Sequence, residues 1–315
     1  MAEKVATRAA YGETLAELGG KYPHIVALDA DLSKSTMTVH FAKKFPERFF
    51  QIGIAESDLV CTAAGLATCG KLPFASSFAI FAARGWEQIR NTIARAKLPV
   101  VLALTHAGCS VGEDGASAQA NEDIAIFRVL PYMRVIVPAD AIETKSCMEY
   151  LVENMDGPAY LRLGRDKLPA VCPDDYSFEL GKAITLRDGD DVSIIACGSM
   201  VCLALEAAES LAAKGIDARV LNMASIKPID RDAIIAAASE TAGIVTAEEH
   251  QVIGGLGGAV AEIVGETHPC PVLRVGMQDK FGESGTPAEV MAKYGHSAEK
   301  IAETAETLLQ NCKCG

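Results

Sequence analysis

The sequence predicts an α/β fold made of two three-layer domains with mostly parallel sheets. Short apolar runs rich in β-branched residues alternate with helical patterns along the whole chain. A stretch punctuated by proline, glycine and aspartate, at residues 169–191, divides these runs into two series. The chain has 315 residues, half of them hydrophobic, which is enough to bury two cores.

The first series begins with residues 1–20, whose pattern predicts an amphipathic helix. Five strand runs follow: HIVALDAD (24–31), LPFASSF (72–78), LPVVLALTHAG (98–108), MRVIVPAD (133–140) and PAYLRLG (158–164). Strands that alternate with helices favour a parallel sheet with helices on both faces.

The second series holds four strand runs: DVSIIACGS (191–199), DARVLNMAS (217–225), AGIVTAEEH (242–250) and PCPVLRVGM (269–277). The change of character after Pro169 places a domain boundary near residues 170–185. We therefore expect a first domain at 1–172 and a second at 183–315.

Charge and hydropathy exclude several functional classes. A formal net charge of −12 argues against nucleic acid or an anionic membrane surface as the main partner. The N-terminus has no apolar segment typical of a signal peptide, and the longest apolar stretch, 192–205, is interrupted and too short to span a bilayer. These features predict a soluble, cytoplasmic protein.

The ten cysteines are scattered singly, mostly in apolar runs such as LVCTAAGLATCG. This usage favours reduced cysteines in the core over a disulfide or zinc framework. Cys312 and Cys314 are separated by one residue and have no partner pair, which is a weak metal signal.

Polar groups follow several of the predicted strands, where ligands bind in open parallel sheets. Asp29 and Asp31 lie at the end of the first run, Phe78 ends the second, and Phe81 follows it. The third run leads, from Thr105 on, into the polar, glycine-rich loop THAGCSVGEDGASAQANED (105–123). A long connection of this kind inside a compact domain is commonly functional.

These residues stand in motifs that resemble transketolases, which are thiamine diphosphate enzymes. In order, the motifs are ATR, DADLSKS, GIAES, SSFAIF, THAGCSVGEDGAS, VPAD and GRDKLP. In the second half, VTAEEHQVIGGLGGAV is similar to the C-terminal domain that transketolases share with β subunits of 2-oxo acid dehydrogenases. The resemblance covers nearly the whole chain and implies a pyrimidine-binding domain followed by a transketolase C-terminal domain.

The resemblance does not include the pyrophosphate-binding domain, which precedes these two domains in full-length transketolases. The EDG at 113–115 is not its GDG motif, because no metal-binding Asn follows at a suitable spacing. The chain therefore resembles the C-terminal subunit of a split, two-chain transketolase. This implies ketol transfer with thiamine diphosphate, and no metal site in this chain. A partner subunit would hold the diphosphate with Mg²⁺ or Ca²⁺, and a homodimer of this chain would lie within a heterotetramer.

The resemblance also implies the cofactor-binding residues. Glu56, alone, reads as a first-turn carboxylate favoured by the helix dipole; by resemblance it bonds the aminopyrimidine nitrogen and is catalytic. Phe78 and Phe81 have the spacing of one helical face, which usually means core, but by resemblance they stack on the aminopyrimidine. Asp31 matches a residue near the thiazolium, although Asp29 could take that role.

By the same resemblance, Arg8, Ser35 and Arg165 hold the phosphate of a sugar phosphate, as two guanidinium forks and a hydroxyl can. His106, a second catalytic candidate, and Asp114 contact the substrate hydroxyls and the region of its carbonyl carbon. For both, ordering of the loop through bonds to its backbone is the simpler alternative.

The chain departs from the family pattern at two positions. Arg84 stands where transketolases often carry tyrosine, and Ala118 where many carry a histidine that contacts the substrate. Gln119 is a possible compensation for Ala118.

In the second domain, Glu248, Glu249 and His250 look like an active-site constellation. We favour dimer contacts and close packing for them, and leave His250 out of the site.

Three alternatives to transketolase remain. A 1-deoxy-xylulose-5-phosphate synthase fits the THAG sequence, but that enzyme is normally one continuous chain. A β subunit of a 2-oxo acid dehydrogenase is disfavoured by the phosphate-binding set. A noncatalytic regulatory or assembly subunit is supported by Ala118 and opposed by the presence of Glu56.

Overall fold

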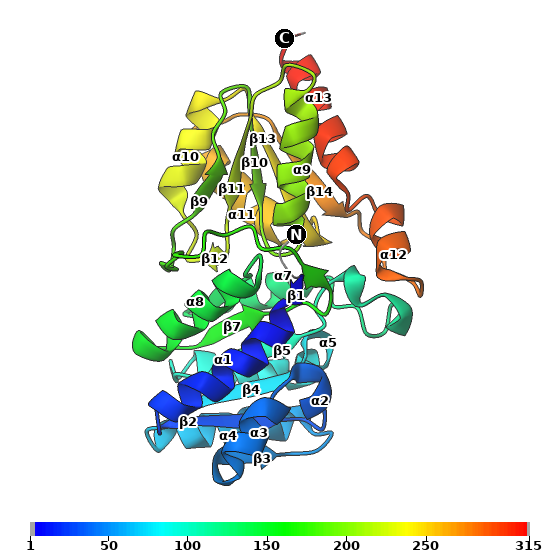
Figure 1. The fold of residues 1–315 in the computed structure, drawn as a ribbon. Coiled ribbons are helices and arrows are strands. Elements are labelled where there is room, and N and C mark those ends of the chain that lie inside the picture. The colour runs from blue at the N-terminus through cyan, green and yellow to red at the C-terminus, as the bar shows by residue number, and fades with distance from the viewer. Residues whose placement is uncertain (1–3, 314–315) are drawn as a thin grey trace.

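Two α/β lobes make up the computed structural model, which describes residues 4–313; the N-terminal half lies below the C-terminal half in Figure 1. The first half forms most of a seven-stranded sheet and the second half a five-stranded sheet, both mostly parallel. The predicted α/β fold class is confirmed. Each of the nine predicted strand runs contains or overlaps an observed strand.

The first sheet has six parallel strands. Their spatial order is β6 (Arg134–Ile136), β7 (Ala159–Arg162), β5 (Val101–Thr105), β4 (Leu72–Phe78), β2 (Ile25–Asp29) and β3 (Phe49–Gln51). A seventh strand, β12 (Ser225–Lys227), pairs antiparallel with β6 although it comes from the second half of the chain.

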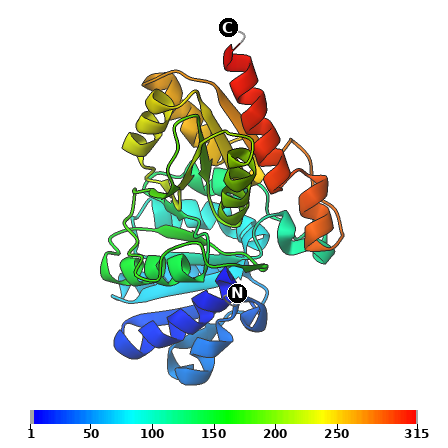
Figure 2. The same cartoon turned by 45° about the horizontal axis from the view of Figure 1, so that its top comes forward.

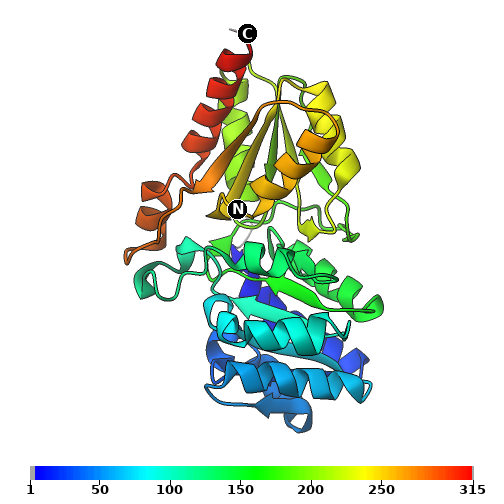
Figure 3. The same cartoon turned by 180° about the vertical axis from the view of Figure 1, so that it is seen from behind.

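Helices cover both faces of this sheet, as the front and back views show (Figures 1 and 3). One face carries α1 (Thr7–Lys21), α3 (Val39–Lys44) and α8 (Ala141–Glu153), and the other carries α4 (Glu56–Thr68), α6 (Trp86–Gln88), η3 (Ile89–Ala94) and α7 (Asp123–Arg128). In β2, Ile25 and Ala27 pack toward α1, whereas Val26 and Leu28 pack toward α4. Because both faces are buried, the strand reads as a continuous apolar run.

The first helix begins later than the sequence predicts. Residues Val5–Ala6 form a short strand, β1, which pairs antiparallel with β8 (Lys167–Leu168), and α1 starts at Thr7. The amide N–H of Arg8 donates to the Gly164 carbonyl at 3.3 Å. This pairing brings Arg8, at the start of the chain, next to the segment that carries Arg165.

The second sheet has the spatial order β14 (Val272–Met277), β13 (Ile244–Gln251), β10 (Val192–Ala196), β11 (Ala218–Asn222) and β9 (Ile184–Arg187), and only β9 is antiparallel. Its two faces are covered by α9 (Met200–Ala212) with α13 (Ala298–Lys313), and by α10 (Arg231–Glu240) with α11 (Leu256–Glu266). Figure 2 shows these layers tilted forward. Helix α12 (Pro287–Lys293) lies outside them, beside η4 (Cys109–Asp114) of the first half.

The nine cysteines within residues 4–313 are free. Cys61 on α4 and Cys69 directly after it are exposed, so the expectation of core positions is wrong for these two. Cys312, near the end of α13, is exposed as well. Cys314 lies outside the described residues. Among residues 4–313, no helix has both the length and the apolar character that crossing a membrane requires.

A buried carboxyl links the two halves. Glu143, near the start of α8, accepts a hydrogen bond from the Ala139 N–H at 2.7 Å, and the Asn222 amide at the end of β11 donates to both carboxylate oxygens at 2.9 and 3.0 Å. Burial raises the pKa of Glu143 to about 7. The carboxyl is therefore protonated in the folded protein at pH values where the unfolded chain has lost the proton.

We predict that the stability of the Glu143→Gln variant, relative to that of wild type, increases as pH rises. Because the folded pKa lies above the ordinary value, wild-type stability should fall between pH 4.5 and 7, by roughly 3 kcal/mol at about 1.4 kcal/mol per pKa unit. Glutamine has no proton to lose, so the difference in melting temperature in favour of the variant should grow from pH 5 to pH 8. A difference that stays constant over this range would contradict the prediction.

Candidate active site

The loop after β2 is organised by Asp29. Its buried carboxylate accepts hydrogen bonds from the Leu32 N–H at 2.6 Å and from the hydroxyls of Thr36 and Thr38 at 2.6 and 2.9 Å. Burial raises the pKa of Asp29 despite these three donors. With its acceptor positions used inside the protein, Asp29 shapes the loop, whereas Asp31 is exposed and has a φ of 64°.

Three rings form a continuous stack at the ends of β4 and β5. Phe78 is the last residue of β4, and Phe81 belongs to the short helix α5 (Ala79–Ala82), so the two do not share one helical face. Their rings are nearly parallel, with centroids 5.5 Å apart and planes at 14°. Phe78 also stacks on the His106 imidazole, with centroids 3.7 Å apart and planes at 25°.

His106 directly follows β5 and is held in a strained conformation, with a φ of 57°. Its Nε2 lies 3.3 Å from an Arg8 guanidinium nitrogen, which can only donate. Nε2 is therefore the acceptor, and Nδ1 donates to the Thr105 hydroxyl at 2.9 Å. Burial, together with the charges of Arg8 and Arg165, lowers the pKa of His106 to about 3.

Arg8 and Arg165 make the region beside His106 cationic. Arg8 donates to the Ser35 carbonyl at 2.8 Å, and burial and the nearby Arg165 lower its pKa. Arg165 donates to the Val111 carbonyl at 3.0 Å and lies 3.5 Å from the Asp114 carboxylate. The structure thus brings together the five residues that the sequence analysis assigned to substrate, namely Arg8, Ser35, His106, Asp114 and Arg165.

Glu56 is the first residue of α4, and its side chain is only 5% exposed. Among the described residues, Arg84 alone provides hydrogen-bond donors to its carboxylate, with one guanidinium nitrogen 3.5 Å from both oxygens. Arg84 is 60% exposed and lies over the Phe81 ring, 5.2 Å from the centroid. Arg84 therefore connects the buried carboxylate to the aromatic stack.

Gln119 does not lie free to replace a histidine at Ala118. Its side-chain N–H groups donate to the carbonyls of Cys109 and Gly112 at 3.3 Å each, and to the Glu283 carbonyl at 3.0 Å. The side chain therefore fastens the glycine-rich loop to the segment before α12.

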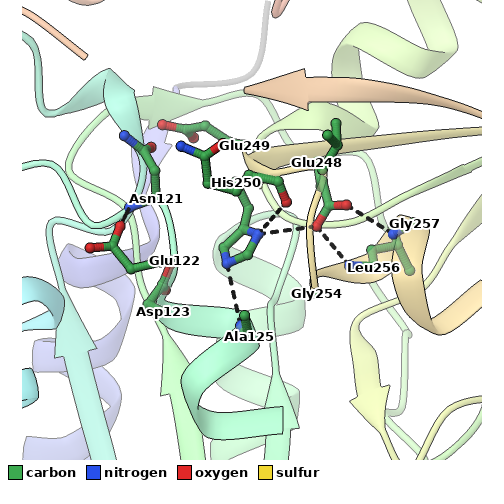
Figure 4. Close-up of polar contacts among 12 residues, drawn as sticks. Asn121, Glu122, Asp123, Ala125, Glu248, Glu249, His250, Gly254, Leu256 and Gly257 are labelled. Atoms are coloured by element: carbon green, nitrogen blue, oxygen red, sulfur yellow. Dashed lines mark hydrogen bonds and ion pairs between the residues drawn. The ribbon is translucent and has the colours of Figure 1, made fainter. Parts of the chain in front are cut away.

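Glu248, Glu249 and His250 are buried at the junction of the two halves, at the end of β13 (Figure 4). The Glu248 carboxylate accepts the N–H groups of Leu256 and Gly257 at the start of α11, at 2.7 and 2.8 Å. His250 accepts the Ala125 N–H at 3.3 Å. The sequence analysis missed the contact between Glu249 and the glycine-rich loop, where the Glu249 carboxylate accepts the Ser110 N–H at 2.7 Å. The sequence feature that could have indicated it is the pair of acidic residues, Glu248 and Glu249, at the end of a predicted strand.

Comparisons with known proteins agree with one another. The family model described as "Transketolase, pyrimidine binding domain" matches residues 3–171, and "Transketolase, C-terminal domain" matches residues 181–301. A "Putative transketolase C-terminal section" of Methanocaldococcus jannaschii is 49% identical over 94% of both chains. A solved structure described as "Split gene transketolase, inactive beta4 tetramer" is 51% identical, with a TM-score of 0.89 over 98% of this chain and 99% of that chain.

Two other relatives differ from each other in length. One of the subunits of an apulose-4-phosphate transketolase from Phocaeicola vulgatus is 41% identical over 96% of both chains. The 1-deoxy-D-xylulose-5-phosphate synthase of Caldanaerobacter subterraneus is 37% identical over 93% of this chain, which spans only 47% of that enzyme.

We predict that the His106 imidazole stays neutral from pH 5 to pH 8. Because its pKa is lowered to about 3, it should gain a proton only well below this range. Its ring resonances in an NMR titration, assigned by their loss in His106→Gln, should keep constant chemical shifts over this interval. A titration midpoint between pH 5 and 8 would show that the two arginines and burial do not control this ring.

Proposed function

Because the chain belongs to the transketolase family, we propose that it is the C-terminal subunit of a two-chain transketolase. The observation that carries this proposal is one continuous site in which a buried carboxylate, an aromatic stack and a cationic group meet. Its similarity in length to a transketolase C-terminal section and to a split-gene transketolase chain supports the two-chain reading.

The proposed reaction moves a two-carbon ketol unit from a ketose phosphate to an aldose acceptor. Arg8 and Arg165 offer two guanidinium groups to a phosphate dianion, and the loop carrying Ser35 borders them. Neutral His106 would hold or move a proton at a substrate oxygen. Asp114, beside Arg165, would accept a hydrogen bond from a substrate hydroxyl. A role in pentose phosphate metabolism in the cytoplasm follows from this assignment.

The residues present fit one half of thiamine diphosphate. Parallel rings beside a buried carboxylate suit a flat, polar heterocycle, so Phe78 and Phe81 would wall the aminopyrimidine, Glu56 would bond its ring nitrogen and Asp31 would lie toward the thiazolium. When bound, the cofactor supplies the carbon nucleophile that no side chain of this chain provides. Glu56 would share a proton with the ring nitrogen. To do so, its carboxylate would replace its contact with Arg84 by a contact with the cofactor.

Among residues 4–313 we assign no side chain to the diphosphate half of the cofactor. No cluster of three or more His, Cys, Asp or Glu within residues 4–313 could hold a metal ion. We infer that a partner subunit with a pyrophosphate-binding domain holds the diphosphate and Mg²⁺ or Ca²⁺. Two copies of each subunit would form a heterotetramer around a homodimer of this chain. The division into a pyrimidine-binding domain at 1–172 and a C-terminal domain at 183–315 belongs to this proposal and is supported by the two sheets.

Two alternatives are less well supported. The 1-deoxy-D-xylulose-5-phosphate synthase relative is about twice as long as this chain, since the chain spans 47% of it. A noncatalytic subunit would have no need for Glu56, the aromatic stack and the cationic group to meet in one place.

We predict that the purified chain alone has no ketol transfer activity, because the proposed partner subunit supplies the diphosphate and metal site. With xylulose 5-phosphate as donor and ribose 5-phosphate as acceptor, activity should appear only after addition of a chain that carries the pyrophosphate-binding domain, with thiamine diphosphate and Mg²⁺. Full activity of the chain alone would refute the two-chain assignment.

We also predict that Glu56→Gln lowers turnover of the reconstituted complex by roughly a hundredfold or more, the range of a positioned acid or base. Folding should survive, because a carboxylate that only favoured a helix start would contribute about 1 kcal/mol or less. Hydrogen exchange at the cofactor's C2, measured without substrate, should slow in parallel.

Arg165→Ala is the control for Glu56→Gln. Loss of a substrate-phosphate contact should chiefly raise KM while C2 exchange remains intact. Unchanged C2 exchange in Glu56→Gln would reduce this residue to a structural carboxylate.

A further inference from the structure

The glycine-rich loop that carries His106 and Asp114 is hydrogen-bonded to the second half of the chain. Besides the Gln119 contact with the segment before α12, a set of contacts comes from the end of β13, at the junction shown in Figure 4. The Gln251 N–H donates to the Asn121 carbonyl at 2.7 Å, and His250 accepts the Ala125 N–H. The loop is therefore fixed at its far end by the C-terminal half, while its near end continues from β5.

Glu249 contacts the loop close to His106, at Ser110. One carboxylate oxygen accepts the Ser110 N–H at 2.7 Å, and the other accepts the Ser199 hydroxyl at 2.6 Å. The side chain is 4% exposed. A carboxylate with both oxygens engaged in a buried place holds a fixed position, and a charged acceptor makes a stronger hydrogen bond than a neutral one.

The loop backbone is shaped to admit this carboxylate. Gly108 has a φ of 86°, and a Cβ at this position would lie 2.2 Å from a carboxylate oxygen of Glu249. Only glycine allows both the conformation and the close approach. Gly108 lies two residues after His106. The backbone against which the Glu249 carboxylate packs and the strained backbone of His106 therefore belong to one short segment.

The backbone of Glu249 is fixed as well. Its carbonyl accepts a hydrogen bond from the Arg162 guanidinium at 2.8 Å, and Arg162 is itself bonded to Asp123. Neither the main chain nor the side chain of Glu249 is therefore free to follow a displaced loop.

We propose that Glu249 is a positioning residue, which sets the path of the glycine-rich loop and thereby the direction of His106 and Asp114. This inference rests on the transketolase function proposed above. In this proposal Glu249 acts through the Ser110 amide. Without this acceptor, the buried Ser110 N–H loses its partner and the loop can relax from its strained conformation.

The test compares Glu249→Ala with Glu249→Gln in the reconstituted complex, using xylulose 5-phosphate and ribose 5-phosphate. Glu249→Ala should lower kcat by roughly 10- to 100-fold, since small misplacements of reacting groups have effects of this size, while KM for the donor changes little. Glu249→Gln should restore most of kcat. Its amide oxygen can accept from Ser110, and its NH₂ can donate to the Ser199 hydroxyl, which can turn to accept.

Glu248→Ala is the matched control. Glu248 is the neighbouring buried carboxylate on the same strand. It accepts hydrogen bonds from Leu256 and Gly257 and lies 3.6 Å from His250 Nδ1, so its polar contacts stay within its own half, unlike those of Glu249. This variant should lower the melting temperature and leave kcat of the folded complex within about twofold of wild type. An equal loss of kcat in Glu248→Ala and Glu249→Ala would overturn the proposal, as would an equal loss in Glu249→Gln and Glu249→Ala.

Amide hydrogen exchange of the free full-length chain provides a readout that needs no activity. In Glu249→Ala, peptides from 107–121 should exchange faster, while peptides from α4 keep their wild-type rates. If Glu249→Ala fails to fold, Ser199→Ala, which frees one carboxylate oxygen, should show the same change to a lesser degree. Unchanged exchange in the loop would overturn the proposal. Ketol transfer absent from the wild-type complex, with faster loop exchange in the variant, would count against the proposed function alone.

Discussion

The arrangement of the site depends on one buried ion pair, between Arg162 at the end of β7 and Asp123 at the start of α7. The guanidinium contacts both carboxylate oxygens, at 2.6 and 3.1 Å, and the Tyr160 hydroxyl donates to the same carboxylate. Burial alone would raise the pKa of Asp123, but Arg162 holds it below its ordinary value. Removing one partner of such a pair typically costs about 3–5 kcal/mol, because it leaves an unpaired charge inside the protein.

This pair does more than hold β7 to α7. Arg162 also bonds the carbonyls of Ala120 and Glu249, which lie on the two sides of the junction between the halves. The end of the glycine-rich loop and the end of β13 are therefore fixed to the same guanidinium. With its far end held in this way, the loop can keep His106 at a φ that a free loop would abandon. Asp31 has a similarly strained φ of 64°, on the loop that Asp29 organises.

The sequence reveals much of this fold because strands buried on both faces leave continuous apolar runs, and polar residues follow them. Phe78 and His106 could be found in this way, each at the end of a strand, whereas Glu56 was assigned through the resemblance of its GIAES motif to transketolases. Contacts between residues far apart in the chain leave no such pattern. Glu249 and Ser110 are 139 positions apart, and Gln119 meets a carbonyl 164 positions away. The approach of Arg84 to Glu56 left no pattern either, because the two residues are 28 positions apart and meet only through the fold.

Strand β12 makes the first half depend on the second, because it comes from the second half of the chain and forms the edge of the large sheet. Without Ser225–Lys227, β6 would become the open edge of the large sheet, with unpaired backbone groups facing solvent. The Lys227 ammonium, which donates to the carbonyls of Arg128 and Leu130, would be lost from the same place. An exposed edge of this kind recruits other strands and promotes aggregation. The N-terminal half is thus not a module that could be transplanted by cutting at the linker, and gene fusions or circular permutations of this chain have to carry β12 with it.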